Sequence, residues 1–440
     1  MALDVNHFFT FSTRRLSVVA SVAALAGASC SGPASALPAG GIVSYDVGLR
    51  PREVAVADLD ADGRLDVVVA NSGDGTITVL AGIGGGQIRR ASAAIAAGRE
   101  PADVDAADID KDGDVDLMVA NHETSRITVL LNNGKARFTP ATGSPFETGA
   151  RPHVHGLATG DFDGDGWIDV SVESADTKEV RVLRGSQQGF GAVTVIPVGT
   201  MPYSRLGSAD VTGDGHADVL VPGHGDNTVR AVQRQGTGFA PATWTIRTSG
   251  QPWMVVGDDV NGDERADIVV VETDAVSIWL GGLDGFSAAP GSPLAVAGAT
   301  EAATGDIDGD GIADTVIGPW DGDEVTVIAG KTLAVRRVRA CERPVGLSVA
   351  DLDGDRRGEI LATCPTQNRL VVVTSSQSVD RESRGVLRTA ARTPCNFLGS
   401  GCSSLLFQLH SFAESLLQIV SAILDGAEVS SLPRSLDQNI

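Results

Sequence analysis

The chain repeats one short acidic segment seven times, at intervals of 45 to 53 residues. The best copies follow the pattern Asp-x-Asp-x-Asp-Gly-x-x-Asp, as between Asp58 and Asp66. Apolar, β-branched runs flank each copy, such as residues 54–57 and 67–70 around the first, and such runs are typical of buried strands. The sequence therefore predicts seven strand–loop–strand units in series, with loops that begin at Asp58, Asp108, Asp161, Asp210, Asp259, Asp306 and Asp351.

The spacing of the acidic residues matches the way proteins hold Ca²⁺. This ion takes six to eight oxygen ligands at about 2.3–2.6 Å, so a short loop must turn alternate side chains inward. Positions 1, 3, 5 and 9 then supply side-chain oxygens, position 7 supplies its carbonyl, and glycine at position 6 permits the turn. Without a cation, each pair of carboxylates 4 Å apart costs roughly 1 kcal/mol in water. We therefore expect about five to seven structural Ca²⁺ ions. The expected ligand positions are Asp58, Asp60, Asp62, Arg64, Asp66, Asp108, Asp110, Asp112, Asp114, Asp116, Asp161, Asp163, Asp165, Trp167, Asp169, Asp210, Thr212, Asp214, His216, Asp218, Asp259, Asn261, Asp263, Arg265, Asp267, Asp306, Asp308, Asp310, Ile312, Asp314, Asp351, Asp353, Asp355, Arg357 and Glu359.

The EF-hand is the nearest alternative calcium loop. Its twelve-residue loop lies between helices and ends with a bidentate Glu at position 12. Here position 12 is apolar, as at Val69, Val119 and Val172, and the flanks have the character of strands. Solvated aspartates in a turn explain one such loop, but not seven in phase. Each loop is therefore expected to join the two strands of a hairpin.

The seven loops are not equivalent. Those that begin at Asp108, Asp161 and Asp306 are complete, whereas Thr212 and Asn261 occupy position 3 of the fourth and fifth loops. Both residues offer an oxygen but one negative charge fewer, so these loops are expected to bind more weakly. The seventh loop has Arg in place of the position 6 glycine and Glu at position 9, and it is the loop most expected to stay empty.

The remaining part of each unit supplies two more strands. A third β-branched run follows each hairpin, as at residues 76–80 and 126–130, and a fourth, less regular stretch often opens with Phe. A proline usually precedes the next unit, with residues 299–301 of the sixth repeat as the exception. Four strands in each unit of nearly fifty residues, repeated seven times, predict an all-β, seven-bladed β-propeller of four-stranded blades.

These loops, phenylalanines and prolines resemble the integrin-type FG-GAP or VCBS repeat family of β-propellers. The resemblance covers residues 42 to about 375. It implies a propeller with calcium between the first and second strands of each blade. It does not imply one activity, because the family includes adhesion receptors, lectins and a few enzymes.

Closure of the ring requires a fourth strand for the last blade. Residues 41–47 precede the first blade as a fourth strand would, and residues 385–391 are the alternative. We favour the N-terminal segment, because it ties both ends of the ring together and removes a free strand edge.

The ends of the chain carry different signals. Residues 1–36 resemble an export signal, with Arg14 and Arg15 before an apolar run and a candidate cleavage site at Ala34 to Ala36. Lipidation of Cys30 is the less favoured alternative. We further expect a propeller over residues 41–375, a linker with a cysteine pair over 376–402, and a helix and tail over 403–440. That helix is predicted to dock on the propeller or to mediate dimerisation, and no membrane span is expected in the mature chain.

Net charge and cysteine content limit the classes of partner and the cellular compartments that we expect. The net charge is −22, so nucleic acid is not an expected partner. Removal or lipidation of Cys30 leaves four of the five cysteines, which fits an exported protein in an oxidising compartment, whether extracellular, periplasmic or in the cell envelope. Cys341 with Cys364, and Cys395 with Cys402, are the plausible pairs.

A ligand is expected on the face opposite the acidic loops, where inner strands begin and second strands end. Trp and Tyr rings stack on sugars and polar neighbours bind hydroxyls, so the expected ligand is a glycan or an extracellular or envelope protein. The candidate ligand-binding residues are His153, His155, Tyr203, Arg205, Trp253 and Trp320. Around them the rim gathers Glu53, Asp103, Asn71, Asn121, His122, Glu173, His224 and Glu272.

Catalysis has little support in the sequence. The chain holds no His-Glu-x-x-His, Gly-x-Ser-x-Gly or P-loop motif. The main hypothesis is an exported, calcium-binding scaffold for binding or adhesion. The alternatives are a polysaccharide lyase that uses His153, His155 and Tyr203 to abstract a proton, and a purely structural protein of the cell envelope.

Overall fold

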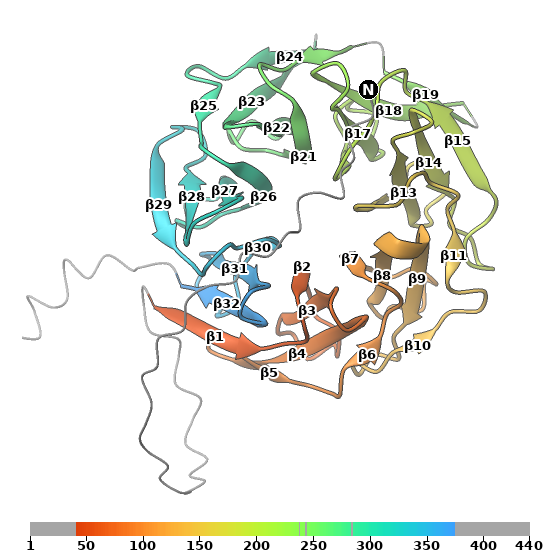
Figure 1. Cartoon of the computed structure of the whole chain (residues 1–440), viewed down its shortest axis with the longest axis vertical. Helices are drawn as coiled ribbons and strands as arrows, with labels where there is room; N and C mark the ends of the chain where they lie inside the picture. The colour runs from red at the N-terminus through yellow and green to blue at the C-terminus, as the bar shows by residue number, and fades with distance from the viewer. Residues whose placement is uncertain (1–40, 237, 243, 283–284, 375–440) are drawn as a thin grey trace, which may run out of the picture. The chain divides into compact units, whose positions relative to one another are not determined.

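The computed structural model describes residues 41–236, 238–242, 244–282 and 285–374, which form a ring of seven antiparallel sheets (Figure 1). Within each sheet the strands follow one another from the centre of the ring outward. The predicted seven-bladed all-β propeller is therefore confirmed. The predicted C-terminal helix, the export segment and the Cys395–Cys402 pair lie outside the described residues.

The first strand of each blade lies nearest the centre of the ring (Figure 1). Four of these inner strands have seven residues, whereas those of the third and fourth blades have only three. The inner strands are β2 (Pro51–Ala57), β7 (Pro101–Ala107), β12 (Ala158–Gly160), β16 (Gly207–Ala209), β21 (Pro252–Asp258), β26 (Ala299–Gly305) and β30 (Leu347–Ala350).

The second strand of each blade begins at position 9 of the acidic loop and is almost entirely buried. β-Branched residues dominate these strands because both faces pack against neighbouring blades. They are β3 (Asp66–Asn71), β8 (Asp116–Asn121), β13 (Asp169–Ser174), β17 (Asp218–Gly223), β22 (Asp267–Glu272), β27 (Asp314–Pro319) and β31 (Glu359–Cys364).

The third and fourth strands complete the blades on the outside. The third strands are β4 (Thr76–Gly84), β9 (Arg126–Leu131), β14 (Glu179–Leu183), β18 (Thr228–Gln235), β23 (Ala275–Gly282), β28 (Glu324–Ile328) and β32 (Arg369–Val373). In four blades the outer strand is divided into two short pieces that both pair with the third strand. The outer strands are β5 (Gln87–Arg90) with β6 (Ile95–Ala96), β10 (Thr139–Pro140) with β11 (Phe146–Glu147), β15 (Val193–Pro197), β19 (Gly238–Pro241) with β20 (Ile246–Arg247), β24 (Gly285–Ala288) with β25 (Leu294–Ala295), and β29 (Val335–Arg339).

The N-terminal segment closes the ring, as predicted. Strand β1 (Ile42–Asp46) pairs antiparallel with β32, so that Ser44 lies opposite Val371. The alternative segment, residues 385–391, lies outside the described residues. The predicted Cys341–Cys364 disulfide is also present, with a Cα–Cα distance of 6.1 Å. It joins the segment before β30 to the end of β31.

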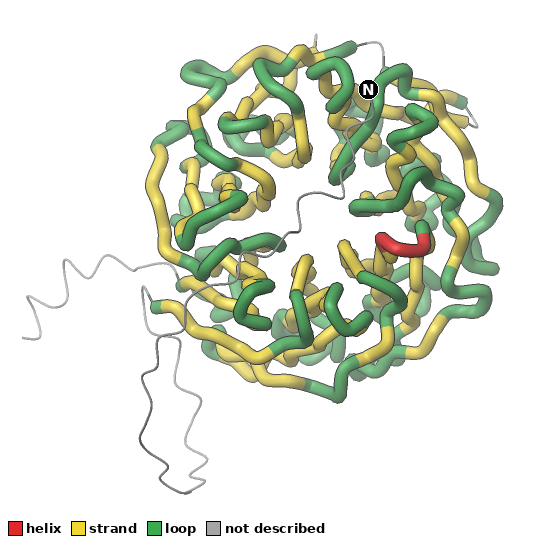
Figure 2. The backbone as a smooth tube through the Cα atoms, viewed as in Figure 1, coloured by secondary structure: helices red, strands yellow, loops and turns green. Residues whose placement is uncertain are grey.

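The hydrophobic core consists of clusters between neighbouring blades. One cluster, for example, packs Val68 and Val79 of the first blade against Val104 and Leu117 of the second. Another packs Leu370 and Val372 of the last blade against the first blade, across the closure point. Strands account for nearly all of the regular structure in the described residues; the exception is a 3₁₀ turn, η2 (His122–Thr124), coloured red in Figure 2. No helix in those ranges has the length and apolar character to cross a bilayer.

The shortened inner strands of the third and fourth blades change the centre of the ring. Residues 153–157 and 203–206 leave the sheet instead of extending β12 and β16, although Pro202 still pairs with Gly223. Gly156 permits this path, because a Cβ there would lie 2.9 Å from the Arg205 side chain and 2.9 Å from Asp103. The two released segments carry four of the six predicted ligand-binding residues.

Candidate functional site

The acidic loops keep one backbone conformation in all seven blades. Positions 4 and 6 both have positive φ in every loop, from Ala61 at 57° to Gly113 at 94°. Glycine adopts this conformation freely, whereas other residues pay a steric cost. Glu264 at 65° and Arg356 at 70° occupy position 6 in the fifth and seventh loops, so those loops keep the shape at that cost. The requirement for a positive φ at position 4 was not predicted from the sequence, although glycine occupies that position in five loops.

The aspartate at position 1 organises each loop from inside. Asp58 accepts hydrogen bonds from the backbone N–H groups of Asp62 at 3.1 Å and Gly63 at 2.9 Å. The corresponding bonds recur in the seventh loop, where Asp351 accepts from Asp355 and Arg356. The loop predicted to stay empty therefore retains the same backbone arrangement.

The acidic residue at position 9 is a structural anchor. Asp66 is 1 % exposed and accepts the backbone N–H of Leu59 at 2.9 Å and of Gly82 at 2.8 Å. These two bonds fix the start of the loop and the end of the third strand to the second strand. The same pair of bonds recurs at Asp116, Asp169, Asp267 and Asp314.

The donor sets of these loops fit a hard divalent cation. Carboxylate oxygens at positions 1, 3 and 9 lie within 4.8 Å of one another in the second and third loops, as do those at positions 1, 3 and 5 in the first loop. The Oδ1 atoms of Asp60 and Asp108 are buried without a hydrogen-bond partner. Burial raises the pKa of Asp169 to about 7, although two backbone hydrogen bonds oppose the shift. A nearby cation would satisfy the orphaned oxygens and favour the ionised carboxylates.

The opposite face of the ring is a second polar centre, called here the mouth: the face where the inner strands begin and the second strands end. In four blades a β-bulge follows the first residue of the inner strand, which sets apart Arg52, Ala102, Trp253 and Thr300. The sixth blade forms this bulge even though Ala299 replaces the proline. The missing proline therefore does not alter the start of that blade.

One half of the mouth is a continuous series of aromatic and imidazole rings from the second to the fifth blade. Neighbouring ring centroids lie 3.9 to 5.2 Å apart along the series His122, His153, His155, Tyr203, His224 and Trp253. At the end of the series, Trp253 donates a hydrogen bond from Nε1 to Thr273 Oγ1 at 3.1 Å. The structure thus brings together four predicted residues, His153, His155, Tyr203 and Trp253.

The histidines of this series are held in a neutral, weakly basic state. Burial and the neighbouring histidines lower the pKa of His122 to about 4. Burial also lowers the pKa of His155 to about 4, although its Nδ1 lies 2.7 Å from Glu173 Oε1. Glu173 is fully buried, and burial raises its own pKa. At neutral pH these imidazoles therefore present lone pairs rather than positive charge.

Arg205 lies below these rings and joins carboxylates from three blades. Its guanidinium contacts Glu53 at 2.6 Å, Asp103 at 3.0 Å and Glu301 at 3.4 Å. Although burial alone lowers the pKa of Arg205, these carboxylates raise it. Asp105 lies nearby, and burial together with Asp103 raises its pKa to about 7. Arg205 was predicted to contact ligand; the structure gives it these internal partners.

The other half of the mouth contains Trp320, apart from the remaining predicted residues. Trp320 is 61 % exposed and lines a cavity of about 420 Å³ with Arg50, Arg52 and Arg343. The Arg343 guanidinium lies 5.5 Å from the centre of the Trp320 ring. These arginines were missed from the sequence because Arg343 belongs to the last blade, whereas Arg50 and Arg52 belong to the first, and the three share no motif.

Other rim residues are structural. Asn71 accepts the backbone N–H of Gly48 at 3.0 Å and donates to Thr78 at 3.1 Å, and it is fully buried. Glu272 is also fully buried and accepts from Ser249 at 2.6 Å. These side chains fasten the connections between blades, so their place at the end of a second strand does not make them accessible.

Comparison with known proteins identifies the family. The FG-GAP-like repeat model matches residues 58–119, 108–172, 210–270 and 259–317, which together make up about half of the chain. The chain therefore belongs to the family of FG-GAP-like repeat proteins. No curated protein matches it in sequence.

Solved structures show the same fold at low sequence identity. BBS1N, crystallised in complex with ARL6DN, is 14% identical with a TM-score of 0.54, and the match covers 76% of this chain and 94% of that one. Virginiamycin B lyase from Staphylococcus aureus is 11% identical with a TM-score of 0.51, with 76% and 99% covered. A functionally unknown protein from Desulfotomaculum acetoxidans is 15% identical with a TM-score of 0.50, with 68% and 88% covered. These similarities concern the fold alone.

Proposed function

We propose that this protein is an exported, calcium-stabilised binding propeller that captures an acidic glycan at its mouth. The observation that carries this proposal is the cavity of about 420 Å³ in which Trp320 and three arginines meet. In a chain with a net charge of −22, such a concentration of guanidinium groups favours an anionic ligand. The exposed indole supplies a flat apolar face of the kind that stacks on a sugar ring.

The ring series of the second to fifth blades extends the same surface. Tyr203 and Trp253 offer apolar ring faces, and the neutral imidazoles offer hydrogen-bond donors and acceptors for hydroxyl groups. An extended glycan would place an acidic group in the arginine cavity and neutral rings along this series. The alternative ligand is a protein. Binding to a partner protein that carries no glycan would favour this alternative over the glycan.

Calcium is assigned a structural role in this proposal. The loops lie at the opposite face from the mouth. Their clustered carboxylates repel one another unless a cation is bound, which gives the ion a role in stability rather than in ligand binding. Extracellular modules typically bind Ca²⁺ with Kd of about 10⁻⁴ to 10⁻³ M, which suits the calcium concentration outside cells. Export is further supported by the signal pattern of residues 1–36 and by the Cys341–Cys364 disulfide.

A lyase activity is less favoured than binding. Proton abstraction needs a base whose pKa lies near the working pH. His122 and His155 have pKa values of about 4, and burial raises the pKa of Tyr203. These groups are therefore poor bases at neutral pH, and we expect no unsaturated products from uronate polymers.

The test is a glycan array that compares neutral glycans with uronate-containing and sulfated glycans, in millimolar Ca²⁺. Arg343→Ala and Trp320→Ala are expected to lose acidic-glycan binding, whereas Trp253→Ala weakens binding to the neutral part. Arg337→Ala is the matched control, because Arg337 is an exposed arginine on outer strand β29. Equal binding by Arg343→Ala and Arg337→Ala, or no preference for acidic glycans, would reject the proposal.

A further inference from the structure

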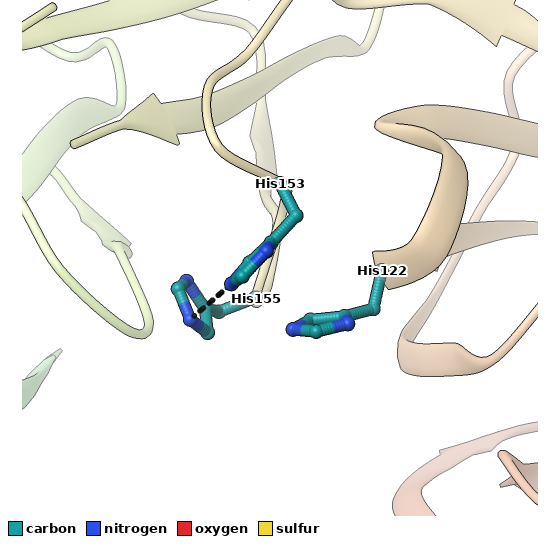
Figure 3. A group of neighbouring side chains, drawn as sticks. All are labelled: His122, His153 and His155. Atoms are coloured by element: carbon teal, nitrogen blue, oxygen red, sulfur yellow. Dashed lines mark hydrogen bonds between the residues drawn. The ribbon is translucent and has the colours of Figure 1, made fainter. Parts of the chain in front are cut away.

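Three histidines from two neighbouring blades converge at the mouth. His122 begins the η2 turn at the end of strand β8, whereas His153 and His155 lie on the segment released before β12. Figure 3 shows the three imidazole rings directed toward one another across the gap between these elements. The convergence depends on the shortened third-blade inner strand, and among the described residues no other three histidines meet in this way.

The nitrogen atoms are spaced as ligands of one metal ion. His153 Nε2 and His155 Nε2 lie 3.2 Å apart. Two nitrogens bound to one tetrahedral zinc ion at about 2.05 Å would lie about 3.3 Å apart. One nitrogen from each of the three rings falls within 4.8 Å of the other two, so a small rotation of His122 would complete the set.

A buried carboxylate orients one of these rings. Glu173 Oε1 accepts the backbone N–H of His155 at 2.7 Å and lies 2.7 Å from its Nδ1. A proton held between Nδ1 and Glu173 leaves the Nε2 lone pair pointing toward the other histidines. This carboxylate–histidine pairing is the usual support of a histidine that ligates a metal. Glu173 is fully buried, and its Oε2 has no hydrogen-bond partner.

The charge around the histidines also favours a cation. His122 Nδ1 lies 3.7 Å from Glu100 Oε2, and it is buried without a hydrogen-bond partner. Glu123 follows His122 in the same turn. These acidic side chains favour a positive ion beside the three imidazoles, and without one His122 Nδ1 keeps no hydrogen-bond partner.

We propose that His122, His153 and His155 bind one borderline divalent metal ion, for which zinc is the best match. Imidazole nitrogens suit Zn²⁺ and its neighbours in the first transition row, whereas Ca²⁺ requires oxygen ligands. The two faces of the propeller thus select different ions: hard calcium at the loops and a nitrogen-seeking ion at the mouth. Three protein ligands leave a fourth position open to water or to an oxygen of a bound molecule. This assignment does not depend on the proposed glycan.

The metal site can be tested with the untagged protein in saturating Ca²⁺. Titration with Co²⁺ should produce the visible absorption of a four-coordinate cobalt ion bound to nitrogen, and Zn²⁺ should displace it at one equivalent per chain. Glu173→Gln is expected to weaken Zn²⁺ binding by about 10- to 100-fold, and His153→Ala is expected to abolish the cobalt spectrum.

The matched control is His224→Ala, because His224 belongs to the same ring series but not to the three histidines. It should leave the cobalt spectrum and the zinc affinity unchanged. Melting curves in Ca²⁺ show whether each variant is folded, and His153→Gln replaces His153→Ala if the latter is not. Absence of a cobalt spectrum in the wild type, or equal zinc affinity in wild type and His153→Ala, would overturn the proposal.

Discussion

The two ends of the propeller deal with crowded carboxylates in different ways. At the loop face, acidic groups recur in every blade, and oxygens such as Asp60 Oδ1 remain without a hydrogen-bond partner. At the centre, Glu53, Asp103 and Glu301 come from three blades and share the single cation of Arg205. Carboxylate clusters that recur in every blade can each be neutralised by a cation from solution. A carboxylate cluster that occurs once can be neutralised by a single basic side chain.

Removal of calcium is expected to have the largest effect, because it acts on all the loops together. A site occupied at ten times its Kd stabilises the fold by about 1.4 kcal/mol, so five independent sites contribute about 7 kcal/mol. Circular dichroism melts in millimolar Ca²⁺ and in EDTA should differ by roughly 10 to 20 °C. Identical melts would show that the loops do not depend on an ion.

Replacement of Arg205 by Met tests the other end of the comparison. It removes the cation that three carboxylates share at the centre of the ring, and loss of one member of a buried ion pair costs about 3–5 kcal/mol. The loss in urea-denaturation free energy should be the same with and without Ca²⁺, since the guanidinium of Arg205 supplies the positive charge at the centre. Arg337→Met on the outer surface serves as the control. If the loss of stability disappears in EDTA, the centre depends on calcium as the loops do, and the contrast between the two regions is wrong.

Asp105 gives the centre a dependence on pH. Its folded pKa of about 7 exceeds the ordinary value of 3.8, so the folded state binds this proton more tightly than the unfolded state does. Stability from this group is therefore present at low pH and is lost as pH rises toward and past 7. Asp105→Asn should be more stable than wild type at pH 8, by on the order of 1 to 2 kcal/mol after allowance for screening by solvent. Denaturation at pH 5 and pH 8 checks this, and an equal difference at both values would contradict it.

Position 6 of the loops offers the smallest effect. Glu264 holds a φ of 65°, which costs a non-glycine residue about 1 kcal/mol. Glu264→Gly should raise the free energy of unfolding by about that amount in saturating Ca²⁺. Gly311→Glu makes the reverse change in the sixth loop and should lower it. If both substitutions shift stability in the same direction, backbone strain is not the cause.

The repeated parts of the molecule could be predicted from the sequence. The number of blades and the hairpin at each acidic loop follow from patterns that recur along the chain, and closure by β1 and the Cys341–Cys364 pair follow from the places of those segments in the repeated blade. Each copy of the pattern strengthens the prediction for the others. Because every blade packs against two neighbours, its second strand must be apolar and β-branched in each copy. Even Ala299, which breaks the proline pattern, occupies the usual place in its blade, because bulge and pairing depend on the whole hairpin.

The mouth could be predicted only in part. Its residues were placed on the correct face, but their grouping depends on distances between blades, which no local pattern encodes. His122 and His153 lie on different blades, and they meet because residues 153–157 leave the sheet. Arg205 turns inward to Asp103, whereas Trp320 lies with Arg343 in the other half. Each of these contacts occurs once, so repetition in the sequence gives no sign of it.

The central claim is that the loop carboxylates, unlike those of the centre, are neutralised by bound calcium. Equilibrium dialysis of the purified protein against Ca²⁺, followed by elemental analysis, counts the ions directly. We predict about five to seven Ca²⁺ ions per chain, and a count unchanged in Arg205→Met. A count of zero or one in millimolar Ca²⁺ would contradict the account.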